Sequence, residues 1–339
     1  MLRTCTPFLF LPLIVACAAA PHEGEPEALA WDQVPITPIA DVAVEIHVPG
    51  DPDFLEVYDA DSAWIMNPST DAVELITDDG VSMQVTGVAP IAAMCLAFDS
   101  LWVAGERGKQ LLRVDPVAGD IVARIDTSIV GYESTIAEAG GKVWLVSDRQ
   151  GTLTAVDPST NAITGTTALE PRSYGVAAGF GSVWVTSMGP RPEKGEDGVR
   201  APAGPGILQR VDATTGELVA TIEVGPTPLF LACGEGAVWV INQGDGTVSR
   251  VDPGTNAVGA TIEVGIDGPG GDIAVGEGMV WVRASKTLLS VIDPATNAVI
   301  ARYGPTAGSG GVRADHGSAW ISAHDTKQVW RLPVAELDL

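Results

Sequence analysis

The side chains in this sequence that could do chemistry are scattered along the chain, and no familiar catalytic motif gathers them. The sequence has no G-x-S-x-G elbow, P-loop, H-E-x-x-H pair or paired C-x-x-C motif. What remains are polar residues in predicted loops, where such groups could bind a polar ligand and Tyr, Glu or His could act as an acid or base. These candidates are Tyr132, Glu133, Arg172, Tyr174, Asn242, Asp272, Arg283 and His324.

The elements that must position these residues form a repeat of about 40 residues. A Trp followed by an aliphatic residue recurs at spacings of 38, 42, 40, 55, 42 and 39 residues. Around each pair lie runs of four to eight residues, rich in Val, Ile and Thr and bounded by Gly, Asp, Asn or Pro, which predict short strands. A four-stranded repeat that recurs seven times predicts an all-β, seven-bladed β-propeller. The seven Trp residues are Trp64, Trp102, Trp144, Trp184, Trp239, Trp281 and Trp320.

The repeat motif also carries a family resemblance. The pattern P-x-x-(apolar)-A-x-G-x-G-x-V-W-V, followed by R-V-D-P-x-T-N-x-V-x-A-T-I-x-V-G, is clearest in Pro226–Gly265. It resembles the repeats of YVTN-type and streptogramin lyase-like propellers, over nearly everything after residue 38. The resemblance implies the propeller fold, and these families include proteins of no known activity, binding modules and a lyase that opens a cyclic ester. For the lyase it implies catalytic histidines and a magnesium ion, but the entry loops Pro228-Leu229-Phe230 and Gly270-Gly271-Asp272 contain no His.

The ends of the repeat array predict how the ring closes. The last repeat contains only three predicted strands, and residues 42–50 match the outer-strand pattern of residues 260–265. We therefore expect an N-terminal strand to complete the last blade, in a propeller that spans residues 39–335. Residues 17–38 lack periodicity and include four Pro, which favours a tether.

The first residues are typical of an export signal. Arg3 precedes the apolar run 8–16, which is too short for a stable membrane span, and Ile14-Val15-Ala16-Cys17 resembles a bacterial lipobox. We interpret residues 1–16 as a lipoprotein signal peptide and Cys17 as the lipidated residue. The alternative, cleavage after Ala20, would place Pro21 directly after the scissile bond. The lipoprotein interpretation predicts a location in the cell envelope, on the periplasmic side of the outer membrane or at the cell surface.

The net charge limits the classes of partner that the protein could bind. A formal charge of −24 disfavours nucleic acid and anionic lipid surfaces, so we expect membrane contact only through the lipid anchor. We also expect a monomer. Four His in the whole chain argue against a transition-metal centre, while the cofactor stays unknown and a Mg²⁺ or Ca²⁺ held by carboxylates stays open. Apart from Cys5 and Cys17, the cysteines Cys95 and Cys233 are expected to be separate free thiols.

Strand direction divides the loops between two faces of the ring. Loops that enter each first strand, and loops between second and third strands, lie on one face, the funnel face, and contain every candidate residue. The Gly-rich turns and the Asp-Pro turns lie on the other face, the turn face, and are uniform from blade to blade. The Asp of the Asp-Pro turns is interpreted as turn chemistry rather than as a metal ligand. These residues are Asp115, Asp157, Asp212, Asp252 and Asp293.

On the funnel face, Tyr132-Glu133 and Arg172-Ser173-Tyr174 belong to adjacent blades and could form a polar binding site, with a rim salt bridge as the alternative. His324 could be a general base or simply an exposed histidine. The insertion 188–206 is either a lid or docking arm, or a disordered loop. We predict an exported, lipid-anchored module that binds a small molecule or protein through its funnel face; the alternative is a lyase or lactone-acting enzyme.

Overall fold

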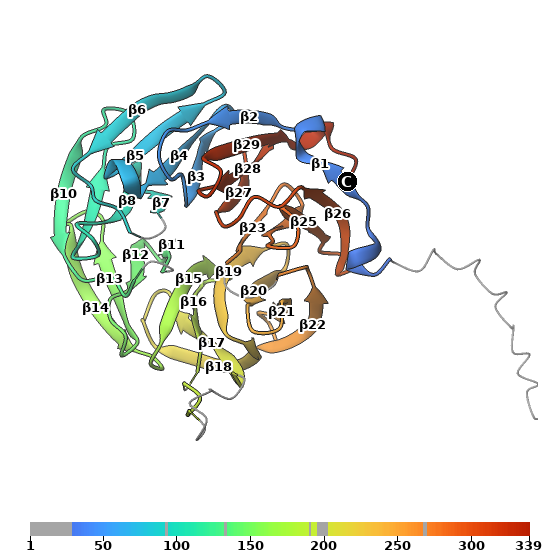
Figure 1. Ribbon diagram of the computed structural model, residues 1–339. Coiled ribbons are helices and arrows are strands. Elements are labelled where there is room, and N and C mark those ends of the chain that lie inside the picture. Colours follow the sequence, from blue (N-terminus) through green and yellow to red (C-terminus); the bar gives the residue numbers. More distant parts are fainter. Residues whose placement is uncertain (1–28, 92–93, 132–133, 190, 195–202, 267–269) are drawn as a thin grey trace, which may run out of the picture.

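The computed structural model describes residues 29–339 except 92–93, 132–133, 190, 195–202 and 267–269. Seven antiparallel sheets are arranged in a ring around a central axis (Figure 1), which confirms the predicted seven-bladed β-propeller. The described helical segments are 3-10 turns of three residues, and none is long or apolar enough to cross a bilayer. These turns are η1 (Trp31–Gln33), η2 (Ile39–Asp41), η3 (Pro68–Thr70) and η4 (Val334–Glu336).

The first four blades each consist of four strands in sequence order, from the axis outward. Blade one contains β3 (Leu55–Asp59), β4 (Ser62–Asn67), β5 (Ala72–Thr77) and β6 (Gly80–Thr86). Blade two contains β7 (Met94–Ala97), β8 (Ser100–Gly105), β9 (Gln110–Val114) and β10 (Ile121–Asp126). Blade three contains β11 (Ile136–Ala139), β12 (Lys142–Val146), β13 (Thr152–Asp157) and β14 (Ala162–Ala168). Blade four contains β15 (Ser173–Gly179), β16 (Ser182–Ser187), β17 (Pro205–Asp212) and β18 (Leu218–Pro226).

The last three blades include the two N-terminal strands. Blade five contains β19 (Pro228–Gly234), β20 (Ala237–Asn242), β21 (Thr247–Asp252) and β22 (Ala257–Glu263). Blade six contains β23 (Asp272–Gly276), β24 (Met279–Arg283), β25 (Leu289–Asp293), β26 (Ala298–Gly304) and, outermost, β1 (Ile36–Pro38). Blade seven contains β27 (Val312–Asp315), β28 (Ser318–Ala323), β29 (Gln328–Pro333) and β2 (Val44–His47).

The repeated Trp holds each blade to its neighbour. In blade four the Trp184 indole is buried and donates to the Gly179 carbonyl at 3.1 Å. The Arg210 guanidinium lies 4.9 Å from the Trp184 ring and donates to the carbonyl of Pro253, in the Asp-Pro turn of blade five. The Asp252 carboxylate accepts turn N–H groups at 2.7 and 3.0 Å, and these bonds lower the pKa of this carboxyl. The turn interpretation of these Asp residues is confirmed at Asp252.

An N-terminal strand closes the ring, as predicted. Strand β2 pairs antiparallel with β29, with Val44 opposite Arg331 and Ile46 opposite Val329 (Figure 1). Ile46 and Val48 are buried against blades one and seven. The strand therefore completes blade seven and covers an edge that would otherwise expose unpaired backbone groups.

Part of the segment 17–38, which was predicted to be a tether, has regular structure, since residues 36–38 form strand β1. Strand β1 runs parallel to β26, and the Trp31 indole donates to Glu263 at 2.9 Å beneath the Arg302 guanidinium. Arg302 also donates to the backbone carbonyl of Asp32. A three-residue strand flanked by Pro has no readable periodicity, so the sequence pattern did not indicate this segment. The predicted signal peptide, Cys17 and the start of the tether lie outside the described residues.

Candidate functional site

The innermost strands of all seven blades enclose a cavity on the ring axis. Its volume is about 340 Å³, and β3, β7, β11, β15, β19, β23 and β27 all contribute lining residues. Cys95 and Cys233 line it as free thiols, as predicted, and burial raises the pKa of both. The charged residues that line it are Glu56, Glu138, Asp272 and Arg313, so carboxylates outnumber cations.

One guanidinium in this cavity lies between two carboxylates. Arg313 Nη1 contacts Asp272 Oδ2 at 2.7 Å, and its Nε contacts Glu56 Oε1 at 3.2 Å. Asp272 is only 2% exposed and also accepts from the backbone N–H groups of Ile273 and Val312. Burial raises the pKa of Glu56, with Arg313 opposing the shift, whereas its carboxylate partners raise the pKa of Arg313 itself. The three side chains form one hydrogen-bonded group in which Arg313 joins blades one and six.

A second group of charged side chains lies on the funnel face, in the loops beside blades one and seven. Asp53 precedes β3, and His324 and Asp325 follow β28. The His324 Nδ1 atom lies 2.9 Å from Asp325 Oδ1. Burial raises the pKa of Asp53 to about 6; His324 opposes the shift, while Asp272 and Asp325 add to it. A carboxyl that titrates near pH 6 beside an imidazole can give or take a proton at physiological pH.

Arg283 supports this group from within the protein. Its side chain is completely buried at the end of β24, and its donors reach four backbone carbonyls at 2.9–3.2 Å, those of Ser322, Ala284, Leu288 and Gly308. Burial lowers its pKa to about 10, so the guanidinium stays charged at neutral pH. Its charge opposes the upward pKa shift of Asp53. Arg283 therefore acts on the funnel through its charge and through the loops it holds.

Two predicted candidates have structural partners elsewhere. The Asn242 amide is buried and donates to Thr247 and Ser249 of its own blade, at 2.9 Å each. Arg172 donates to the Gly189 carbonyl at 2.7 Å and to the Met188 sulfur at 3.2 Å. Arg172 thus holds the start of the insertion 188–206, while the half-buried Tyr174 packs against the core.

The remaining predicted pair, Tyr132-Glu133, lies outside the described residues, so its proposed meeting with Arg172 stays a prediction. The structure instead brings together Asp53, Asp272, His324 and Asp325, which we call the funnel cluster, with Arg283 behind it. Sequence reasoning named Asp272, Arg283 and His324 separately but did not join them. Ring closure places blade seven beside blade one, so that Arg313 meets Glu56 across 257 positions of sequence.

Whether the site could hold a metal ion depends on which side chains could act as ligands together. Among the residues that the structure describes, no three His, Cys, Asp or Glu side chains are arranged to hold an ion. The Asp272 carboxylate is already engaged by Arg313 and by backbone N–H groups. A cation bound at Asp272 would therefore have to replace these contacts.

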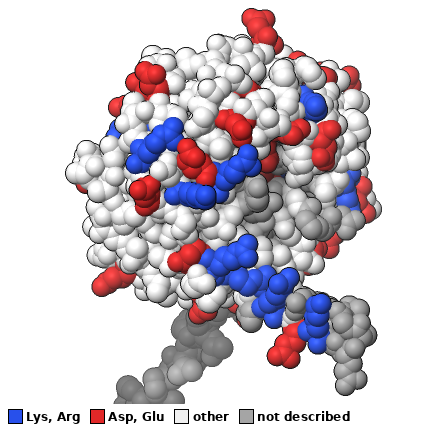
Figure 2. Space-filling model, turned by 60° about the vertical axis from the view of Figure 1, so that its left-hand side comes forward, with Lys and Arg blue, Asp and Glu red and all other residues white. Residues whose placement is uncertain are grey.

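Exposed charges of both signs are mixed on the surface of the described residues. Figure 2 shows Lys and Arg side chains interspersed with Asp and Glu on the face it presents, despite the net charge of −24. Typical exposed pairs are Arg107–Asp71 at 3.4 Å and Arg124–Glu106 at 2.9 Å. Such pairs contribute little stability, and their mixed signs do not form a surface of one charge.

Comparison with known proteins agrees on the class of fold, a seven-bladed β-propeller. No protein-family model matches the chain, and no curated protein matches it either. Among solved structures, it is similar to a catalytically inactive His-to-Ala variant of virginiamycin B lyase from Staphylococcus aureus, solved with quinupristin. That similarity has a TM-score of 0.68 and 14% identity over 85% of this chain and 98% of the lyase. A streptogramin B lyase structure gives 0.65 and 13% identity, over 90% of this chain and 99% of that one. At such identity the similarity establishes the shared fold alone.

Proposed function

We propose that this protein is an exported propeller that binds a small polar molecule in its funnel cluster. The observation that supports this most directly is the convergence of Asp53, His324 and Asp325 on the funnel face, with the pKa of Asp53 raised to about 6. Among the described residues, the Asp53 carboxylate accepts no hydrogen bond, unlike that of Asp272. A carboxyl left without a donor in a partly buried site favours a ligand that brings a hydroxyl or ammonium group.

The binding proposal is tested by thermal-shift screening against sugars, amines, cyclic esters and divalent metals. A ligand of the funnel cluster should raise the melting temperature of the wild type, because it binds only the folded state. The same compound should stabilise Asp53→Asn and Asp325→Asn much less. Glu235→Gln, which removes one exposed charge from the turn face, is the matched control and should respond like the wild type. Equal stabilisation of all four proteins would place binding outside the funnel cluster.

The cellular setting is a separate part of the proposal and depends on residues 1–17. We infer that Cys17 carries the lipid that holds the protein at the cell envelope, on the strength of the lipobox-like Ile14-Val15-Ala16-Cys17. Expression in a bacterial host with radiolabelled palmitate should label the wild type and leave Cys17→Ser unlabelled and released from the membrane fraction. Equal labelling of both proteins would contradict the lipid anchor.

A lyase is the second candidate, favoured by one specific observation. His324 and Asp325 form an imidazole–carboxylate pair at 2.9 Å beside the titratable Asp53, and the fold is shared with streptogramin B lyases. A lyase would open a cyclic ester without water: a base removes a proton from the carbon next to the C–O bond, a C=C bond forms and the carboxylate leaves. His324 is the candidate base.

Quinupristin is the substrate with which to test the lyase. Under this candidate the wild type opens the ring, reversed-phase chromatography resolves the linear product, and His324→Ala abolishes its formation. A substituted control on the turn face, His316→Ala, should keep full activity because this residue lies outside the funnel cluster. Unchanged quinupristin after incubation with the wild type would rule out this substrate, while leaving the binding proposal intact.

A further inference from the structure

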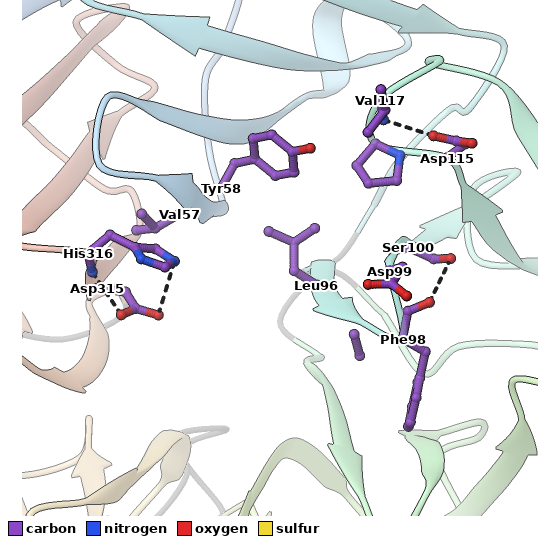
Figure 3. A pocket seen from close by; sticks show the side chains of 12 residues that line it. Val57, Tyr58, Leu96, Phe98, Asp99, Ser100, Asp115, Val117, Asp315 and His316 are labelled. Atoms are coloured by element: carbon purple, nitrogen blue, oxygen red, sulfur yellow. Dashed lines mark hydrogen bonds and ion pairs between the residues drawn. The ribbon is translucent and has the colours of Figure 1, made fainter.

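A larger cavity lies on the turn face, opposite the funnel cluster. Its volume is about 630 Å³, and it is bordered by blades one, two and seven (Figure 3). Tyr58 at the end of β3 and Leu96 in β7 point into it, and Val117 lies in the Asp-Pro turn of blade two. The wall therefore combines an aromatic ring with aliphatic side chains, as binding cavities for small molecules usually do.

Blade two departs from the repeat at the first turn that borders this cavity. The two-residue hairpin between the first and second strands needs left-handed backbone, and in blades three to seven its second residue is Gly. Blade two has Asp99 at this position, with a φ of 51°. The equivalent glycines are Gly141, Gly181, Gly236, Gly278 and Gly317, with φ values of 70–80°. Gly adopts this conformation at less cost than any L-residue, although Asp tolerates it better than most, so the replacement of Gly by Asp costs the turn some stability.

The second turn of blade two that borders this cavity also differs in sequence from the equivalent turns of the other blades. Its Asp-Pro turn continues with Val117-Ala118, where the equivalent turns have Ser159-Thr160, Thr214-Thr215, Gly254-Thr255 and Ala295-Thr296. Val117 is 74% exposed, although it is an aliphatic side chain. Both changes lie at the rim of one cavity, one adding a charge and the other an apolar contact.

The charges of the lining are almost entirely negative. Carboxylates of Asp99, Asp115 and Asp315 line the cavity together with His316, and neither Lys nor Arg is among the lining residues. Asp115 is occupied by the N–H groups of its own turn, at 2.8 and 2.9 Å, and Asp315 Oδ1 accepts from the His316 N–H. The Asp99 carboxylate makes no hydrogen bond or ion pair within the described part of the chain.

We propose that this turn-face cavity binds a small organic cation with an aromatic body. The ring of the ligand lies against Tyr58, Leu96 and Val117, where burial of apolar area favours it. Its ammonium group faces Asp99 and Asp315 and replaces water as the hydrogen-bond donor to the exposed Asp99 carboxylate. This site is independent of the funnel cluster, so either proposal can fail alone.

Isothermal titration with matched amines and alcohols tests the proposal. Tryptamine and phenethylamine are the cations, and tryptophol and 2-phenylethanol carry the same rings without the charge. We expect the amines to bind about two- to fivefold more tightly than their alcohols, since an ion pair at an exposed carboxylate such as Asp99 contributes only a small binding free energy. Indole-3-acetate, which carries the opposite charge, should not bind.

Variants locate the site. Asp99→Asn keeps a residue that tolerates left-handed backbone and should weaken tryptamine binding about two- to fivefold without changing tryptophol binding. Glu235→Gln, in the equivalent hairpin of blade five, is the matched control and should bind both as the wild type does. Chemical-shift changes should cluster at the Tyr58 ring. Failure of both amines to bind at millimolar concentration, equal affinity of amines and alcohols, or unchanged tryptamine binding by Asp99→Asn would each overturn the proposal.

Discussion

The two faces of the ring hold charge in different ways. Around the axial cavity and the funnel cluster, charges are partly or fully buried and paired, as in the contact between Arg313 and Asp272, whose side chains are 20% and 3% exposed. On the turn face, carboxylates are exposed, and most are occupied by the backbone of their own turn, as Asp252 is. Asp99 differs from the Asp of these turns, because its exposed carboxylate accepts no N–H group of its own turn among the described residues, as is also true of the exposed Glu235.

The turns of blade two differ from the equivalent turns of the other blades. The turn face was predicted to be uniform, and its Asp-Pro turns do share one hydrogen-bond pattern. Its large cavity nevertheless lies where blade two replaces the repeat residues in two turns. Uniform positions build the ring, and departures from them are the places to look for ligands on either face.

The largest expected effect on stability comes from loss of strand β2, which completes blade seven. Blade seven supplies His324 to the funnel face and Asp315 to the turn face, and β2 completes this blade. A chain shortened to begin at residue 51 loses the buried Ile46 and Val48, about 1.5–3 kcal/mol each, together with a strand of the ladder. That is a large part of the stability of an ordinary domain. We expect this chain to lose cooperative melting by circular dichroism.

A chain shortened to begin at residue 39 is the control for ring closure. It lacks β1 and Trp31 but keeps β2, so the ring stays closed and melting should remain cooperative at a lower temperature. Equal melting curves for the chains beginning at 39 and 51 would show that β2 is dispensable.

The second expected effect separates buried from exposed charge. Arg283→Met leaves four buried carbonyls without their donor and removes a positive charge near Asp53 and Asp272. Loss of one partner from such a buried group typically costs about 3–5 kcal/mol. Urea unfolding should show this loss, whereas Arg107→Met, at a side chain 71% exposed, should change stability by less than about 1 kcal/mol. Similar losses in both variants would remove the distinction between the two kinds of charge.

The third expected effect is a pH dependence of opposite sign on the two faces. Folding raises the pKa of Asp53 from its ordinary 3.8 to about 6, so the folded state keeps a proton that the unfolded state has lost. Stability therefore falls as the pH rises from about 4 to 6 and is level above that range. Asp53→Asn should be more stable than the wild type at pH 7, by on the order of 1–2 kcal/mol, and equal to it at pH 3. Denaturant unfolding at both pH values measures this.

The turn face provides the contrast. Turn N–H groups lower the pKa of Asp252, so its contribution is present at neutral pH and is lost as the pH falls through the folded pKa. Asp252→Asn should therefore gain no stability at pH 7. A gain at pH 7 in both variants, or in neither, would contradict the difference in electrostatic environment.

Much of the fold could be predicted because propeller blades repeat their local chemistry. The period of the Trp residues, the turn signals and the match of residues 42–50 to an outer strand each depend on neighbours in sequence. Strand β1 could not be predicted, since its only sign is a Trp31 whose partners Glu263 and Arg302 lie more than 230 positions away.

The sites were less accessible to sequence reasoning. Asp272, Arg283 and His324 were named, but the roles of Arg283 as a buried support and of Asp53 as a titrating group depend on burial and on ring closure. The signal for the turn-face cavity was present in the sequence, as Asp99 at a position that is Gly in blades three to seven. It becomes informative only once pairing registers align the hairpins.

The smallest expected effect tests whether Asp99 serves the turn rather than a ligand. Asp99→Gly should raise stability by about 0.5–1 kcal/mol, because Gly adopts the left-handed backbone without steric cost. The reciprocal change Gly278→Asp, at a turn with open space around it and a φ of 77°, should lower stability by about 1 kcal/mol. Urea unfolding resolves both. Destabilisation by Asp99→Gly would mean that the carboxylate stabilises the fold, and the departure of blade two from its repeat would then need no ligand.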